Sequence, residues 1–198
     1  MPRKPEYDRD ELIDRARDLF WKQGWAGTSL KDLENVLGIK PGSFYAAFGS
    51  KDALFELTLD RYAETGANRL EALVERHGAL GALQRYPKLV VDASTAMAKA
   101  CMLSKTVLEL GGKDNKLAAR ANAHLSKMEA LFATLFRKAQ DDGHVAQTFN
   151  ADVLARRYQS DLLGLRFSAE RTGVDAKAIA HEIEECLAEL AKTNRRGK

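Results

Sequence analysis

The feature that most constrains the fold of this chain is the stretch TSLKDLENVLGIKPGSFYAAFGSK at residues 28–51. Its first apolar residues recur at the spacing of one helical face, and Thr28 or Ser29 can cap that helix with a side-chain hydroxyl. Gly38 follows the last apolar residue, where the chain needs a left-handed backbone that glycine adopts most easily. The stretch is therefore predicted to begin with a short capped helix that ends in a glycine turn.

A second short helix is predicted directly after this turn. Pro41 suits the first position of a helix, because its φ is already helical and it has no N–H group to leave unsatisfied. Phe44 and Phe48 are four residues apart and share one face, which we expect to point inward, whereas Tyr45 is left outside. Two helices joined by a short turn form the helix-turn-helix geometry of DNA-binding proteins, although a plain helical hairpin has the same pattern.

The second helix and its flanks contain no acidic side chain. Residues 38–51 include two lysines, three hydroxyl side chains and no Asp or Glu. A donor-rich patch without acids suits contacts to DNA phosphates, and a plain helical hairpin has no need of one. We predict phosphate contacts from Thr28, Ser29, Ser43, Tyr45 and Lys51, and place Lys40, Pro41 and Gly42, at the tip of the second helix, nearest to the bases.

Residues 8–57 resemble the DNA-binding domain of TetR/AcrR-family transcriptional regulators. The resemblance rests on the capped helix, the glycine turn and the run GSFYAAFGSK at residues 42–51, which matches the family pattern G-[ST]-[LF]-Y-x-x-F-x-[SN]-K. It implies an all-α protein in which an N-terminal three-helix helix-turn-helix domain is joined by a long helix to a C-terminal helical bundle. It also implies a homodimer formed through the last two helices.

Two details of this segment bear on that resemblance. Ala46 and Ala47 stand where many family members carry His or Tyr, and their methyl groups can touch a thymine methyl but cannot donate hydrogen bonds. Family members usually keep an aromatic residue near the position of Trp25, so we expect Trp25 to belong to the core.

The composition of the chain is typical of a soluble helical protein. Of its 198 residues, 45% are hydrophobic and 30% are charged, and no apolar run approaches the roughly 20 residues of a membrane span. No alternating strand pattern of useful length is present. Two widely spaced cysteines and an N-terminus without an apolar segment predict a cytoplasmic protein without a disulfide framework. The net charge of +3 is too small to indicate nucleic-acid binding by itself.

We predict a functional boundary near Lys51. Residues 1–50 are expected to form the helix-turn-helix DNA-binding domain, and residues 51–198 a domain for ligand sensing and dimerisation. A long helix that ends near His77 is expected to cross the boundary, followed by a helix over residues 83–99. A ligand that tilts the long helix would change the distance between the two DNA-binding heads of a dimer, which must sit roughly 34–36 Å apart or a multiple of it.

The C-terminal part resembles the NemR-like subgroup of the family. The resemblance rests on residues 100–103, Ala-Cys-Met-Leu, followed by Glu109, which are similar to a (G)CLL…E motif with alanine in place of glycine. Some members use this cysteine to sense electrophiles or oxidants. Cys101 would lie at a helix N-terminus, where the helix dipole favours thiolate, so it is a candidate sensor; a small buried hydrophobic residue is the alternative. Some side chains suit an ordinary core and are also candidates for lining a ligand pocket: Tyr62, Met97, Met102, Phe132, Phe136, Tyr158 and Phe167.

These features favour a transcriptional regulator that binds a double-stranded DNA operator. We predict a repressor that a small-molecule or electrophile effector of unknown identity releases from its operator. One alternative is a DNA-binding regulator without a sensor, and another is a small helical enzyme. The sequence does not support the enzyme hypothesis, because no glycine-rich phosphate loop, nucleophile elbow or metal-spaced triad is present. The four histidines are scattered, so no metal site and no cofactor are predicted.

Overall fold

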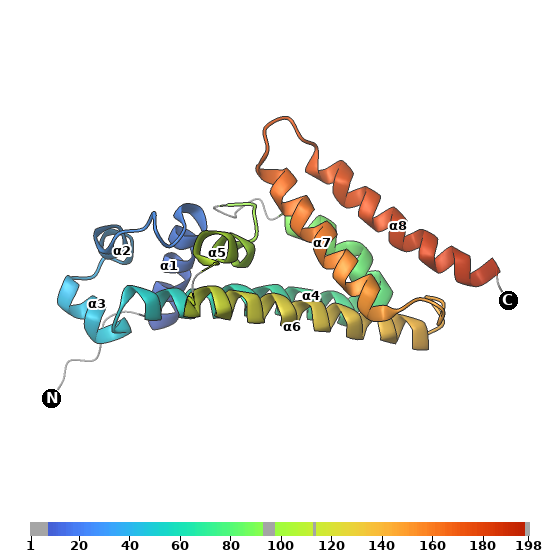
Figure 1. Cartoon of the computed structure of the whole chain (residues 1–198), viewed down its shortest axis with the longest axis horizontal. Helices are drawn as coiled ribbons and strands as arrows, with labels where there is room; N and C mark the ends of the chain where they lie inside the picture. Colours follow the sequence, from blue (N-terminus) through green and yellow to red (C-terminus); the bar gives the residue numbers. More distant parts are fainter. Residues whose placement is uncertain (1–7, 93–97, 113, 197–198) are drawn as a thin grey trace. The chain divides into compact units, whose positions relative to one another are not determined.

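The computed structural model describes residues 8–92, 98–112 and 114–196, with side chains described up to residue 190. Within these ranges it contains eight α-helices and no strand (Figure 1), which confirms the predicted all-α class. None of the described helices is long and apolar enough to cross a membrane. The helices are α1 Arg9–Gln23, α2 Leu30–Leu37, α3 Pro41–Phe48, α4 Lys51–Val91, α5 Met102–Leu110, α6 Lys116–Asp141, α7 Ala151–Glu170 and α8 Ala176–Arg196.

The described residues form two compact units. The first unit draws on Met1–Thr65 and Met102–His124, and the second on Gly66–Cys101 and Leu125–Lys198. Both α4 and α6 therefore contribute to each unit. The unit that contains α1–α3 also contains α5 and the first part of α6, which no local sequence pattern indicated.

The first unit is built around the inward faces of α1 and the start of α4. Asp8 caps α1 by accepting a hydrogen bond from the N–H group of Asp10 at 2.9 Å. Phe20 on α1 meets Phe55 on α4 edge-on, with ring centroids 4.7 Å apart, an arrangement that aromatic pairs favour. The buried apolar residues of these two faces are Leu12, Ile13, Ala16, Phe20, Trp21, Leu54, Phe55 and Leu59.

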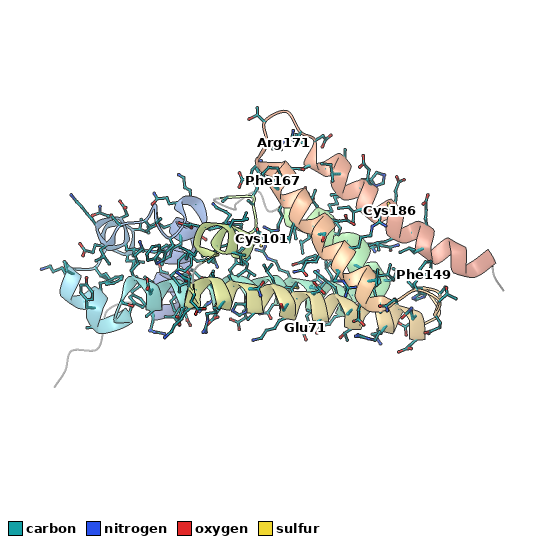
Figure 2. All side chains as sticks on the ribbon, viewed as in Figure 1. Glu71, Cys101, Phe149, Phe167, Arg171 and Cys186 are labelled. Atoms are coloured by element: carbon teal, nitrogen blue, oxygen red, sulfur yellow. The ribbon has the colours of Figure 1, made fainter. Side chains whose placement is uncertain are left out.

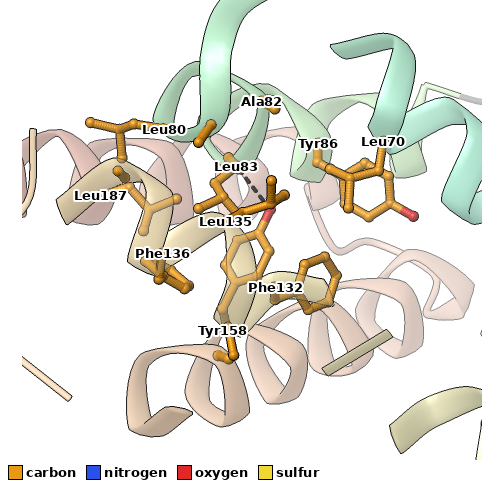
Figure 3. Packing of buried hydrophobic residues seen from close by; sticks show 14 of the residues in the cluster. Leu70, Leu80, Ala82, Leu83, Tyr86, Phe132, Leu135, Phe136, Tyr158 and Leu187 are labelled. Carbon is orange, nitrogen blue, oxygen red and sulfur yellow. Dashed lines mark hydrogen bonds between the residues drawn. The ribbon is translucent and has the colours of Figure 1, made fainter. Parts of the chain in front are cut away.

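The second unit has a core of aliphatic and aromatic side chains from α4, α6, α7 and α8 (Figure 3). Phe132 meets Tyr158 edge-on at 4.9 Å between ring centroids. The Tyr158 hydroxyl donates a hydrogen bond of 2.6 Å to the carbonyl oxygen of Leu83. Burial raises the pKa of Tyr158 well above its usual value, so the hydroxyl keeps its proton and this buried polar group is satisfied.

The middle of the chain departs from the predicted helix boundaries. The backbone leaves helical geometry at Gly78, with φ 70° and ψ 178°, next to the predicted end at His77. The second stretch of α4 then ends at Val91, so the helix predicted over residues 83–99 is wrong in its last part. The N–H groups of Lys99 and the residue after it instead donate hydrogen bonds to the carboxylate of Glu170 at 2.6 and 2.7 Å.

The suggested pocket-lining side chains belong to two different units. Phe167 on α7 is 64% exposed (Figure 2), so the expectation that it lies in a pocket or in the core was wrong. Met97 lies outside the described residues. The remaining ones divide between the two units, with Tyr62 and Met102 in the first and Phe132, Phe136 and Tyr158 in the second.

Candidate nucleic-acid interface

The first helix of the predicted helix-turn-helix begins and ends as its residues require. Ser29 caps α2: its hydroxyl oxygen accepts the N–H of Asp32 at 3.1 Å, and the Asp32 carboxylate accepts the backbone N–H of Ser29 at 2.9 Å. Hydrogen bonds that the Ser29 hydroxyl and then the Ser29 backbone N–H donate to the Asp32 carboxylate lower the pKa of Asp32. Gly38 ends α2 in the left-handed conformation at φ 66°, and Ile39 fills the corner with 5% exposure. The predicted cap and glycine turn are confirmed.

The second helix divides into an inner and an outer face as predicted. Pro41 is the first residue of α3. Phe44 and Phe48 are buried with 0% and 6% exposure, whereas Tyr45 is 49% exposed. The outer surface of α3 and its tip contains no acidic side chain and is formed by the exposed residues Lys40, Pro41, Gly42, Ser43, Tyr45, Ala46 and Ala47.

Two hydroxyl side chains predicted to contact phosphates already have partners in this structure. Thr28 is 1% exposed, and its hydroxyl donates a hydrogen bond of 2.7 Å to the carbonyl oxygen of Gly24. The exposed Ser29 hydroxyl donates to the Asp32 carboxylate at 2.6 Å. Thr28 therefore stabilises the connection between α1 and α2 from inside. Ser29 lies at the surface, where its backbone and its hydroxyl both form hydrogen bonds with Asp32.

Lys51 lies at the start of α4 in contact with Trp25. Its Nζ is 4.2 Å from the centroid of the Trp25 ring, and the Nε1–H of that ring donates to the Asp52 carboxylate at 2.9 Å. Burial lowers the pKa of Lys51, while the negative charges of Asp52 and Glu109 oppose this shift. Trp25 is half-buried, so the expectation that it belongs to the core was wrong. Its ring instead shields one side of the Lys51 ammonium group.

The sequence reasoning missed Arg9. This exposed residue in the first turn of α1 holds its guanidinium carbon 5.6 Å from the centroid of the Phe48 ring on α3. A cation in the first turn of a helix is unfavourable with the helix dipole, so its presence there suggests an anionic partner such as a DNA phosphate, and the same holds for Lys51 in the first turn of α4. The same argument could have identified Arg9 as a cation beside α3.

The candidate sensor residue occupies a position outside this interface. Cys101 is 7% exposed and directly precedes α5 (Figure 2), whereas Cys186 on α8 is exposed. In the part of the chain that the structure describes, no group of three His, Cys, Asp or Glu residues is arranged to hold a metal ion.

Comparison with known proteins adds independent information about this interface. Residues 12–58, which span α2 and α3, match the family model described as bacterial regulatory proteins, tetR family. The uncharacterized HTH-type transcriptional regulator YezE of Bacillus subtilis is 30% identical over 197 residues, which cover 96% of this chain and 100% of that protein. The HTH-type transcriptional repressor ComR of Escherichia coli is 27% identical over 167 residues, which cover 82% and 80% of the two chains.

A solved structure extends the likeness to the whole fold. It contains a cysteine-substituted variant of the TetR family transcriptional regulator CifR in complex with a 26-base-pair double-strand operator DNA. The two chains superpose with a TM-score of 0.80 at 27% identity, over 93% of this chain and 97% of that one. The fold described above is thus one that occurs in a protein bound to DNA.

Proposed function

Because the chain belongs to the TetR family of DNA-binding transcriptional regulators, we propose that it is a homodimeric repressor whose α3 binds an operator and whose effector releases it. The observation that supports this proposal most is that α3 has one buried face and one exposed face. Its two phenylalanines are buried, and its outer face is exposed and free of acids. A short helix of this kind can enter the major groove with its N-terminal residues toward the bases.

We assign the surrounding polar groups by their place around α3. Lys40, Pro41 and Gly42 at the N-terminal tip lie nearest to base edges. Phosphates on either side are contacted by side chains that carry hydroxyl or positive groups, because such contacts orient a protein on the duplex without reading its sequence. These side chains are Arg9, Ser29, Ser43, Tyr45 and Lys51, and Thr28 supports them from inside the connection between α1 and α2.

The Lys51→Ala variant should bind every duplex more weakly than the wild type and with a shallower salt dependence. Each neutralised phosphate adds about 0.9 to the slope of log K against log salt, so the loss of one contact lowers the slope by about that amount. Tyr45→Phe removes a neutral hydroxyl and should weaken binding with the slope unchanged. Fluorescence anisotropy at several salt concentrations measures both quantities.

A matched control for this test is Lys127→Ala, which removes the same charge from an exposed position on α6. A drop in slope for both lysine variants would indicate a general charge effect, and an unchanged slope for Lys51→Ala would remove Lys51 from the contact set.

Dimerisation through α7 and α8 is supported by the apolar surface that these helices present. A groove of about 510 Å³ runs between them, and Val153 on α7 is 51% exposed. An apolar face left open in one chain is a typical site of subunit association, and a dimer would place two copies of α3 on two half-sites. The partly buried apolar residues beside this groove are Leu154, Ile179, Ile183 and Leu190.

Release by an effector is supported by the surroundings of Cys101. The two residues before it are held to α7, because the Glu170 carboxylate accepts their N–H groups and Arg166 donates to the carbonyl oxygen of Lys99 at 3.1 Å. The residue after it begins α5. Cys101 as a residue is only 7% exposed, which leaves little room for an adduct, so modification would displace the adjoining residues and α5 with them.

Treatment with a thiol electrophile such as N-ethylmaleimide should therefore abolish DNA binding by the wild type and spare Cys101→Ser. The measurement is anisotropy of a labelled duplex before and after treatment. The matched control, Cys186→Ser, should lose binding like the wild type, since it retains Cys101. Wild-type binding that is indifferent to the electrophile would exclude Cys101 as the sensor and direct the search to non-covalent ligands.

A further inference from the structure

Two charged side chains of α5 hold the end of α1 and the loop that follows it. Lys105 Nζ donates a hydrogen bond of 2.6 Å to the carbonyl oxygen of Trp21, in the last turn of α1. A cation at a helix C-terminus is favourable with the helix dipole. Four residues further along α5, the Glu109 carboxylate accepts the backbone N–H groups of Trp25 at 3.1 Å and Ala26 at 2.7 Å.

The close approach of Glu109 depends on glycine at position 24. Gly24 has φ 80°, a conformation that L side chains rarely adopt, and a Cβ atom there would lie 2.8 Å from Glu109 Oε2. A larger residue at position 24 would therefore be strained by this backbone conformation, and the Glu109 carboxylate would have to shift to make room for its Cβ atom. Both oxygens of the Glu109 carboxylate accept a hydrogen bond in this contact, and the absence of a side chain at Gly24 leaves room for them.

Trp25 extends this contact to the first turn of α4. Its backbone N–H is held by Glu109, its Nε1–H donates to Asp52, and its ring lies against the Lys51 ammonium group at 4.2 Å. Glu109, Trp25, Asp52 and Lys51 thus form one connected set of contacts within the first unit. Any movement of Glu109 relative to the loop changes the support of Lys51.

From these contacts we propose that Glu109 and Trp25 are positioning residues for the phosphate contact of Lys51, so that α5 controls how well Lys51 meets the DNA. This inference rests on the proposed function, because it takes Lys51 to bind phosphate. It adds a route of regulation: the helix that directly follows Cys101 also holds the support of a DNA-contacting cation. Displacement of α5 would then weaken DNA binding without touching α3.

A double-mutant cycle tests this proposal. Glu109→Gln keeps the size of the side chain, but its amide nitrogen faces one of the two N–H donors and cannot accept from it. The salt slope of this variant should fall toward that of Lys51→Ala, by up to about 0.9. In the Lys51→Ala background the same substitution should cause no further fall in slope. The probe is the duplex recovered by selection with the wild-type protein from a random library.

The direction of the change in DNA affinity distinguishes a positioning role of Glu109 from a simple effect of its charge. Removing an acid reduces repulsion of DNA, so Glu75→Gln, at an exposed position of α4, should leave binding equal to the wild type or tighter. Glu109→Gln should weaken it. Trp25→Phe provides a second test if Glu109→Gln lowers the helical circular dichroism signal. It leaves the backbone contacts with Glu109, removes the donor to Asp52 and replaces the indole beside Lys51 with a smaller ring. It should reduce the slope in the same direction.

The outcomes distinguish this proposal from the proposed function. If Lys51→Ala lowers the slope while Glu109→Gln and Trp25→Phe match the wild type, the Lys51 contact stands and the positioning role is overturned. A fall in slope for Glu109→Gln that persists in the Lys51→Ala background would also overturn it. If Lys51→Ala itself has the wild-type slope, the phosphate contact fails first and the positioning proposal with it.

Discussion

The Phe44→Ala variant is expected to bind duplex DNA at least about a hundredfold more weakly than the wild type. Phe44 is 0% exposed, and truncation of a buried phenylalanine to alanine costs about 3–5 kcal/mol, which corresponds to a factor of at least roughly a hundred. Phe44 is one of only two buried side chains among the eight residues of α3, so we expect the loss of packing to act mainly on this helix. A helix this short is not stable without packing, so the exposed face that carries Tyr45 would lose its fixed orientation.

Anisotropy titrations of Phe44→Ala and Phe44→Leu against the same labelled duplex measure this effect. The leucine variant keeps most of the buried apolar surface and should lie between alanine and the wild type. The far-ultraviolet circular dichroism signal should change little in either, because α3 is a small part of an eight-helix chain. Wild-type affinity in Phe44→Ala would show that α3 is not the DNA-binding element.

The Phe132→Ala variant is expected to lose about 3–5 kcal/mol of unfolding free energy. Phe132 is 1% exposed and its ring meets both Tyr158 and Tyr86 at 4.9 and 6.0 Å between centroids. The substitution removes two edge-on aromatic contacts and leaves a cavity that well-packed neighbours fill only in part. Urea unfolding followed by circular dichroism measures the loss.

Truncation to alanine at an exposed position controls for the Phe132 measurement. Leu108 on α5 is 85% exposed and lies outside the two helices proposed to form the dimer, so Leu108→Ala should change the unfolding free energy by less than about 0.5 kcal/mol, the usual range for surface substitutions. A loss below about 1 kcal/mol for Phe132→Ala would contradict the close packing of the second unit.

Local signals in the sequence predicted the parts of the structure that depend on neighbouring residues. Gly38 ends α2 in the left-handed conformation and Pro41 begins α3, because each satisfies a backbone requirement at its own position. The same holds for Ser29, one of the two residues predicted to cap α2, whose hydroxyl accepts the N–H group of Asp32. Caps and turns are decided within a few residues, so the sequence alone is informative about them.

The sequence was less informative where distant segments decide the outcome. A proline usually starts or kinks a helix, but Pro87 lies within α4 and the departure from helical geometry occurs at Gly78. Trp25 was expected in the core, yet its indole contacts Lys51 and Asp52, which lie on another helix. The partner of its backbone N–H, Glu109, is 84 residues away. Periodicity identifies a helical face but cannot identify what that face meets.

The extent of each packing unit also escaped prediction. Glu109 reads in the sequence as part of a family motif, and nothing local indicates that its carboxylate accepts two N–H groups from the connection between α1 and α2. The functional boundary predicted near Lys51 stays a prediction, since packing divides the chain differently and places α5 with the DNA-binding helices.

The most direct test of this account is the salt dependence and stoichiometry of DNA binding by the wild-type protein. The measurement is anisotropy over a series of salt concentrations with the duplex selected from a random library, together with sedimentation of the complex. The account predicts one dimer for each duplex and an affinity that falls linearly, on logarithmic scales, as salt rises. Failure to bind any duplex in a salt-sensitive way would contradict it.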